Sequence, residues 1–202
     1  MNTSIAARLE QQINFILEID RLKQIMRQSY LTHSERKEND AEHSWHLAIM
    51  AILLQEYARE PIDVLRVVKM VLVHDLVEID AGDTFCYDDA GALHKHAREV
   101  LAAERIFHLL PADQADEVRE LWDEFEDGVT PEARFANALD RIEPLLLNFS
   151  TCGRSWQEHG ITVERVRERN LHIVSGGAPV LGEYIQELID EALQRGYLPS
   201  EG

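Results

Sequence analysis

An apolar segment that runs directly into ionisable residues is the strongest constraint in this sequence. The stretch from Val67 to Val73 is almost entirely apolar, and His74 and Asp75 follow it at once, with further acids at positions 78, 80 and 83. Burying charged side chains costs free energy unless they are paired or bound to a metal ion. The segment therefore predicts a buried site in which a positive charge, such as a metal ion, compensates the acids.

Most of the chain has the apolar periodicity of helices. Apolar residues recur at spacings of three to five, as on one helix face, in the ranges 5–25, 41–53, 62–79, 92–110, 118–125, 131–146, 162–173 and 179–195. The run at 67–73 also suits a buried strand by composition, but its continuity with helical neighbours favours a helix. No segment alternates with period two. We therefore predict an all-α fold, with one domain of seven or eight helices over residues 1–202.

Two local features sharpen this prediction. Thr130 and Pro131 offer an N-cap hydroxyl followed by proline at the first helical position, which is typical of a helix start. Tryptophans 45, 122 and 156 are expected to anchor a core or an interface. The second helix is expected to turn one apolar set toward the core, namely Trp45, Ala48, Ile49, Ile52 and Leu53.

Composition excludes several classes of partner and location. The net charge of −17 repels phosphate backbones, so we expect no nucleic acid polymer as a partner. A small phosphorylated ligand is compatible with this charge, because a metal ion can reverse the local field. The sequence contains no window of about 18 apolar residues, so we expect no membrane span. The start of the chain lacks a signal-peptide pattern. Cys86 and Cys152 have no metal-binding spacing and are expected to be free thiols in the cytoplasm.

Side chains on one helix can share a metal ion with side chains from other helices. Adjacent helical residues point about 100° apart, so His74 and Asp75 can both reach an ion beside the helix. Glu78 follows His74 by four residues and shares that face. His43, in NDAEHSW, and Asp140, in NALDRIEP, are candidates from other helices. Taken singly, His43 also suits a helix-terminal surface position, and Asp140 also suits a pair with an arginine.

The ordered set of these residues resembles a known signature. His43, then His74 with Asp75, then Asp140 resemble the H…HD…D pattern of the HD-domain metal-dependent phosphohydrolases. Longer blocks are similar to the subgroup that includes bacterial 5'-deoxynucleotidases and their eukaryotic HD-domain-containing relatives. These blocks are ENDAEHSWHLA, VLVHDLVEIDAGDT, LWDEFEDGVTPEARFANALDRIEPLL and SWQEHGIT. Together they span about residues 20–175, which is most of the chain.

The resemblance implies a fold, a cofactor and a reaction. It implies an all-helical domain with one divalent ion held by His43, His74, Asp75 and Asp140. Two imidazoles and two carboxylates suit manganese, cobalt, nickel, iron or zinc, and magnesium is a further option. The implied substrate is a small phosphorylated molecule, most simply a (deoxy)nucleoside 5'-monophosphate, which water activated by the ion would split into nucleoside and phosphate. The resemblance also leaves a homodimer open.

Three further residues match positions with roles in this subgroup. Glu78 is expected to handle the proton of the attacking water as general acid/base. Asp83 is expected to orient a water or protonate the leaving oxygen, although a turn residue at a helix end is the alternative. Arg27 is expected to bind the substrate phosphate through its guanidinium, with a solvated helix-end arginine as the alternative. The bacterial enzymes have an aromatic residue directly after this arginine, whereas Gln28 follows here.

Competing functions stay open at this level. An HD phosphodiesterase or a nucleoside triphosphate hydrolase would need a basic triphosphate site or a second metal site, and few lysines or arginines cluster near the motif. A non-catalytic nucleotide-binding regulator is the third possibility. An incomplete set of metal ligands would support it, whereas the set of four candidate ligands is complete here. His94 and His96 lie in a polar helix-start setting, where surface positions are expected, so the sequence favours a single ion.

Overall fold

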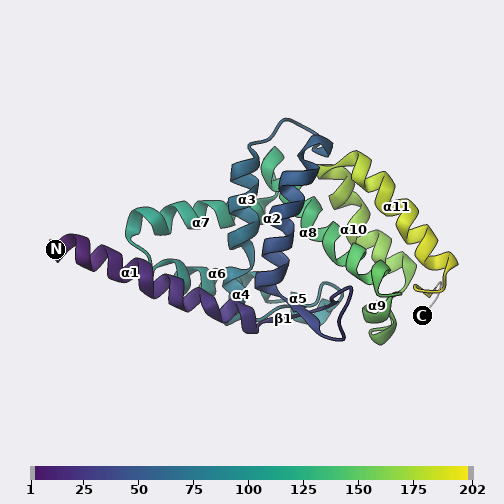
Figure 1. The fold of residues 1–202 in the computed structure, drawn as a ribbon, viewed down its shortest axis with the longest axis horizontal. Helices are drawn as coiled ribbons and strands as arrows, with labels where there is room; N and C mark the ends of the chain where they lie inside the picture. Colours follow the sequence, from purple (N-terminus) through teal and green to yellow (C-terminus); the bar gives the residue numbers. More distant parts are fainter. Residues whose placement is uncertain (1–2, 200–202) are drawn as a thin grey trace.

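The structure is a computed structural model that describes residues 3–199, and helices make up most of it (Figure 1). Eight helices in this range have ten or more residues: α1 (Thr3–Ile19), α2 (Asp40–Leu54), α3 (Val64–Val73), α6 (Lys95–Phe107), α7 (Ala112–Asp127), α8 (Pro131–Ser150), α10 (Val163–Gly177) and α11 (Pro179–Gln194). Shorter helical pieces are α4 (Glu78–Ala81), α5 (Asp89–Ala92), α9 (Arg154–Glu158) and the 3₁₀ turns η1 (Asp20–Gln24), η2 (Gln55–Tyr57) and η3 (His74–Val77). The all-α prediction is confirmed.

A small hairpin is the one feature of the described residues outside this prediction. Strand β1 (Met26–Tyr30) pairs antiparallel with β2 (Lys37–Asn39). The predicted first helix is therefore too long, because α1 ends at Ile19 and η1 leads into β1. Arg27 consequently lies on a strand and not at a helix end. These strands are too short to show a period-two pattern in the sequence.

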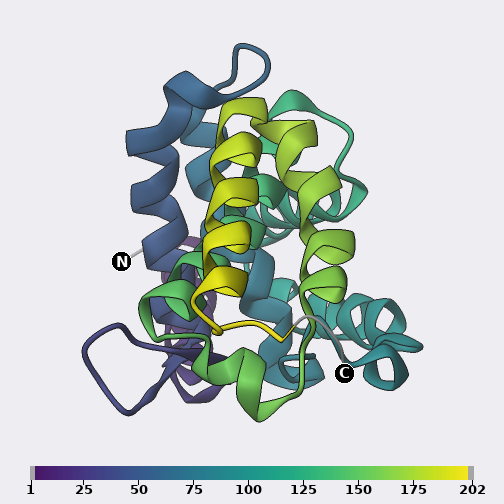
Figure 2. The same ribbon diagram turned by 90° about the vertical axis from the view of Figure 1, so that its right-hand side faces the viewer.

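The core consists of two apolar clusters that meet near α3 and η3. The larger one is built around α8, which packs against α2, α3, α10 and α11 (Figures 1 and 2). Leu47, Met70 and Leu139 are fully buried there. The smaller cluster gathers α6, α7 and the segment η3–α4 around Trp122 and Ile106. Two of the three predicted tryptophan anchors are in the core, since Trp122 and Trp156 each have 1% of their surface exposed, whereas Trp45 is 63% exposed.

The predicted long helix over residues 62–79 is broken at the ionisable residues. Asp63 caps α3 by accepting hydrogen bonds from backbone N–H groups, and α3 ends at Val73. His74 begins the 3₁₀ turn η3, and α4 follows until Gly82, whose φ of 76° ends the helix. A 3₁₀ turn has three residues per turn and is tighter than an α-helix. His74, Asp75 and Glu78 are nevertheless all buried.

The prediction for the inward face of α2 is wrong for all but Ala48. Trp45, Ile49, Ile52 and Leu53 are 63%, 38%, 50% and 66% exposed. The buried face instead carries Asp40, His43, Ser44, Leu47, Ala48, Met50 and Ala51. Apolar residues occur on nearly every side of this helix, so periodicity could not choose between faces. The side of α2 that is buried is the one that carries His43, because the acids that surround His43 lie in the interior.

Two further findings bear on the sequence predictions. Cys86 and Cys152 are both free, as predicted, and both are exposed. Among the residues that the structure describes, no helix combines the length and the apolar character needed to cross a membrane.

An ion pair joins three helices and makes stability depend on pH. Arg66 of α3 donates to Glu124 of α7 at 2.8 Å, and the hydroxyl of Thr130, which caps α8, donates to the same carboxylate at 2.6 Å. Burial raises the pKa of Glu124, but the hydrogen bonds from Arg66 and Thr130 outweigh it and lower the pKa below its usual 4.5. A lowered folded pKa adds stability above the unfolded pKa, and this stability is lost as pH falls through the folded value.

We therefore expect Glu124→Gln to lower the free energy of unfolding by about 1 kcal/mol at pH 7. The difference from the parent chain should shrink as pH falls below 4.5, where the parent loses the same charge. Urea unfolding between pH 7 and pH 3 measures this. Glu183→Gln, on the exposed side of α11, is the control. A difference that stays constant over this pH range would contradict the prediction.

Candidate metal centre

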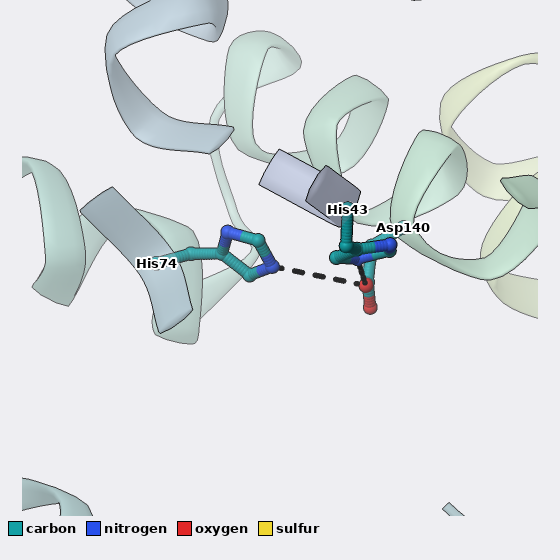
Figure 3. Close-up of side chains that lie close together, drawn as sticks. All are labelled: His43, His74 and Asp140. Atoms are coloured by element: carbon teal, nitrogen blue, oxygen red, sulfur yellow. Dashed lines mark hydrogen bonds and ion pairs between the residues drawn. The ribbon is translucent and has the colours of Figure 1, made fainter. Parts of the chain in front are cut away.

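Three side chains from three distant segments converge at the junction of α2, η3 and α8. His43 Nε2 lies 3.0 Å from Asp140 Oδ1, and His74 Nε2 lies 3.8 Å from the same oxygen (Figure 3). The three donor atoms all lie within 4.8 Å of one another. Both imidazoles are buried, at 0% and 5% exposure. Such a group of nitrogen and oxygen donors has the spacing needed to surround one ion.

The hydrogen bonds of His74 favour a metal ligand. His74 Nδ1 lies 2.9 Å from the carbonyl oxygen of Val71, which can only accept, so Nδ1 carries the proton. The lone pair of Nε2 then points into the centre, where this buried atom has no hydrogen-bond partner among residues 3–199. Asp75 Oδ1 lies 3.1 Å from it. Three of the four predicted ligands, His43, His74 and Asp140, thus form one group, whereas Asp75 adjoins it through His74 and groups with Asp40 and Glu78. Two imidazoles and two carboxylates in this arrangement have the chemistry to hold a divalent ion.

Two buried acids behind His43 were missed in the sequence. Glu143 Oε2 lies 3.2 Å from His43 Nδ1, and Glu143 Oε1 lies 3.0 Å from His46 Nδ1. Burial raises the pKa of Glu143, but hydrogen bonds from the two histidines outweigh this and lower it to about 2. Glu38 Oε2 lies 3.7 Å from His43 Nδ1, and burial together with the Glu143 charge raises its pKa to about 9.

This arrangement fixes the tautomer of His43. His43 Nδ1–H donates a hydrogen bond to the ionised carboxylate of Glu143, so Nε2 is left to face Asp140 and an ion. Carboxylates that orient a metal-binding histidine in this way are typical of metal centres. The signal available in the sequence was that Glu143 follows Asp140 by three residues, on the apolar side of the same helix.

A second group of acids surrounds Arg27 beside these ligands. Arg27 donates to Asp75 Oδ2 at 2.9 Å and to Asp40 Oδ1 at 3.3 Å. Glu78 is close enough for its carboxylate to cluster with those of Asp40 and Asp75. Asp40 Oδ2 and Glu78 Oε2 are buried and have no hydrogen-bond partner in the described part of the chain. Burial, followed by the charges of Asp75 and Asp40, raises the pKa of Glu78 well above its usual value.

A cavity of about 360 Å³ opens onto this centre. Arg27, His74, Asp75, Glu78, Asp83 and Asp140 line one part of it, whereas His43 lies outside its lining, behind Asp140. Burial raises the pKa of Asp83 in this wall. Lys95 also lines the cavity, with Nζ 3.2 Å from Glu99, and was missed in the sequence. A phosphate in this cavity would lie among cations and proton-transfer groups.

The histidines at 94 and 96 lie outside this centre. Both are exposed, as predicted. His96 lies near Glu99 and Glu126 in a group with metal-ligand spacing. The single ion therefore stays a prediction.

Glu143→Gln tests the positioning of His43. A glutamine keeps the size but loses the charge, and we expect metal affinity to fall by roughly 10–100-fold, as for other groups that orient a ligand. Competition with a chromophoric chelator measures the affinity. Glu187→Gln, exposed on α11, is the matched control, and Asp140→Ala gives the effect of removing a ligand. Unchanged affinity in Glu143→Gln, with binding lost in Asp140→Ala, would show that the Glu143 charge plays no such role.

Comparison with known proteins agrees with this geometry. A family model described as HD domain matches residues 19–181, a range that contains all four candidate ligands. The human 5'-deoxynucleotidase HDDC2 is 32% identical over 135 residues, which cover 66% of this chain and 65% of that protein. The chain thus spans slightly less than two thirds of this relative. The Schizosaccharomyces pombe 5'-deoxynucleotidase hdd1 is 31% identical over 149 residues, covering 71% of this chain and 74% of that protein.

A solved structure agrees over nearly the whole chain. The protein from Magnetospirillum magnetotacticum named as a predicted metal-dependent phosphohydrolase is 52% identical, with a TM-score of 0.93 over 98% of this chain and 99% of that one. A Pyrococcus horikoshii protein shares the fold at a TM-score of 0.60 and 22% identity, covering 91% of this chain and 99% of that one. Because the family match covers most of the 202 residues and includes the histidine–aspartate pair, this chain belongs to the HD-domain family.

Proposed function

We propose that this protein is a metal-dependent phosphomonoesterase that hydrolyses (deoxy)nucleoside 5'-monophosphates to nucleoside and phosphate. The observation that carries the proposal is the buried Nε2 atom of His74, which lacks a partner among the described residues and faces His43, Asp75 and Asp140 at the end of a cavity. The names of the human and S. pombe relatives as 5'-deoxynucleotidases support the substrate class. His43, His74, Asp75 and Asp140 would hold the ion.

Positive charge from the protein binds the phosphate. When bound, a divalent ion supplies Lewis acidity, which neutralises phosphate charge and makes nearby water more acidic. Arg27 donates from the cavity wall, and its planar guanidinium can bind two phosphate oxygens at once. Lys95 adds a second cation to the same wall. Burial alone lowers the pKa of Lys95, but the charges of Glu99, Glu78 and Asp75 outweigh it and keep the ammonium protonated.

Two acids divide the proton transfers. Glu78 Oε2 is free to take the proton of the attacking water as the oxygen–phosphorus bond forms. Its raised pKa is suited to a group that must accept a proton. Asp83, in the same wall, protonates the 5' oxygen as its bond to phosphorus breaks, and its raised pKa favours the protonated form. The products are then a nucleoside and inorganic phosphate.

Other residues of the cavity lining are suited to contacting a nucleoside. Tyr87, Asn148, Trp156 and Asn170 line the cavity, and they combine aromatic surface with amide groups. A volume of about 360 Å³ is in the usual range for a pocket that binds one small molecule.

A nucleoside triphosphate hydrolase is the second candidate function. Arg141 and Arg169 also line the cavity, so the structure brings together more cations than the sequence motif alone indicated. Additional phosphates would find partners in these guanidinium groups.

We also propose a domain organisation and a cellular location for this protein. We propose that residues 1–202 form a single HD domain. The two free thiols are typical of a reducing compartment, so we propose the cytoplasm as its location.

Phosphate release from a substrate panel tests the function. The protein is stripped with EDTA, and manganese, cobalt, zinc or magnesium is added back before assay on ribo- and deoxynucleoside 5'-monophosphates, triphosphates and a phosphodiester. We expect activity to require the metal and to be highest on monophosphates. Full activity without metal would refute the proposal. Higher turnover of triphosphates would favour the second candidate.

Glu78→Gln tests proton transfer separately from metal binding. We expect kcat to fall by roughly 10²–10⁴-fold, because a glutamine cannot take a proton from water. Metal content, measured by mass spectrometry, should stay equal to that of the parent chain. Glu117→Gln, at an exposed position on α7, is the control. A loss of activity that is explained by a loss of metal would contradict the role of Glu78.

A further inference from the structure

One arginine in the cavity wall has no partner in the described part of the chain. Arg141 of α8 lines the cavity, and its Nε atom is buried without a hydrogen-bond partner among residues 3–199. Every other arginine in this range forms at least one hydrogen bond, whereas Arg141 forms neither a hydrogen bond nor an ion pair there. A buried donor without a partner costs free energy, and such groups are rare in native structures. Acids are not scarce, because the chain has 37 aspartates and glutamates and only 20 lysines and arginines.

Other cations of the cavity wall are already paired with carboxylates. These pairs are Arg27 with Asp75 and Asp40, Lys95 with Glu99, and Arg169 with Asp89. An incoming anion must share each of these cations with an acid of the protein. The charge of Arg141, in contrast, is not shared with any carboxylate of the described residues.

The position of Arg141 suits an anion that also reaches the metal centre. Arg141 directly follows Asp140, so one turn of α8 carries both a candidate ligand of the ion and this guanidinium. Adjacent helical residues point about 100° apart, and both of these residues line the cavity. Burial raises the pKa of the Cys86 thiol, and the charge of Arg141 is the strongest influence that opposes this rise. The guanidinium is therefore also near the part of the cavity wall that holds Cys86.

The chemistry of this side chain selects the kind of anion. A guanidinium only donates hydrogen bonds, and its planar N–H groups match two oxygens of one phosphate. A phosphate monoester carries roughly −1.5 to −2 charges at pH 7. The net charge of −17 on the chain opposes the approach of such an anion. A cation that no acid neutralises offsets this repulsion at the place where the phosphate must bind.

We propose that Arg141 is the residue that contributes most of the protein's affinity for the phosphate group of the substrate. This role rests on the proposed phosphomonoesterase function and adds a residue to it. The contact is made in the bound substrate and is kept in the transition state, so it lowers KM and leaves kcat nearly unchanged. Arg27 also contacts the phosphate but adds less affinity, because Asp75 and Asp40 already share its charge.

Binding of inorganic phosphate tests this role without turnover. Calorimetry on the metal-loaded protein gives the dissociation constant of phosphate, which is a product of the proposed reaction. Arg141→Gln should raise this constant by roughly 10–100-fold, because hydrogen bonds to a charged group are lost. Arg141→Lys should give an intermediate value, since it keeps the charge but loses the planar pair of donors. Arg134→Gln is the matched control, because Arg134 lies two turns earlier on α8, outside the cavity lining, and pairs with Glu60.

Steady-state kinetics on a nucleoside 5'-monophosphate give a second readout. We expect KM of Arg141→Gln to rise by a similar factor while kcat stays nearly unchanged. Thermal unfolding separates this role from a structural one. The midpoint of unfolding should not fall in Arg141→Gln, because the arginine forms no hydrogen bond or ion pair within residues 3–199 that the variant could lose.

Three results would overturn the role of Arg141. They are a parent protein that does not bind inorganic phosphate, an unchanged dissociation constant in Arg141→Gln, and a rise in KM for nucleoside triphosphates alone. The last result would assign Arg141 to the outer phosphates of a longer substrate. Failure of the proposed function is distinguishable from these, because the parent chain would then bind phosphate through Arg141 but release none from nucleoside monophosphates.

Discussion

Negative charge buried at the junction of α2, η3 and α8 is the constraint on which the rest of this structure depends. Asp40, Asp75, Glu78, Glu143 and Glu38 are all buried there, and Asp140 is half-buried. Arg27 reaches Asp40 and Asp75, and His43 lies between Asp140 and Glu143. Unpaired charge in an interior is costly, so this arrangement demands further positive charge. A divalent ion among His43, His74, Asp75 and Asp140 would supply it.

Local structure near the junction follows from that requirement. The 3₁₀ turn η3 interrupts a strongly apolar segment where its side chains must change from core packing to the centre. The hairpin β1–β2 brings Arg27 and Glu38 to the start of α2, where Asn39 forms a capping box with Glu42. α8 crosses the junction, and its residues Asp140 and Glu143, three apart, both contact His43. Each element therefore contributes polar groups to the centre, and the helices also contribute apolar groups to the surrounding core.

The helix α2 has two sides of different character. Its inner side holds His43 among carboxylates, and its outer side holds Trp45 and Ile52 in solvent. One helix therefore carries a metal-ligand candidate on one side and an uncovered apolar stripe on the other. No residue of α2 lines the cavity, whose walls come from β1, η3, α6, α8 and the segment near Tyr87 among other parts of the described chain.

The sequence by itself determined the helical class, the start of α8 at Thr130 and Pro131, and the set of residues from which a metal centre could be built. These follow from periodicity, capping and the cost of burying His74 and Asp75, which are local properties of the chain. Tertiary structure alone decided which side of α2 is buried, where Arg27 lies and which acids stand behind His43. The side of α2 could not be predicted because the helix carries apolar residues on nearly every side. The place of Arg27 could not be predicted because the strands are too short to show a pattern. The two acids behind His43, Glu38 and Glu143, are more than a hundred residues apart in the chain. Such pairings depend on contacts between segments distant in the chain, and no local pattern encodes them.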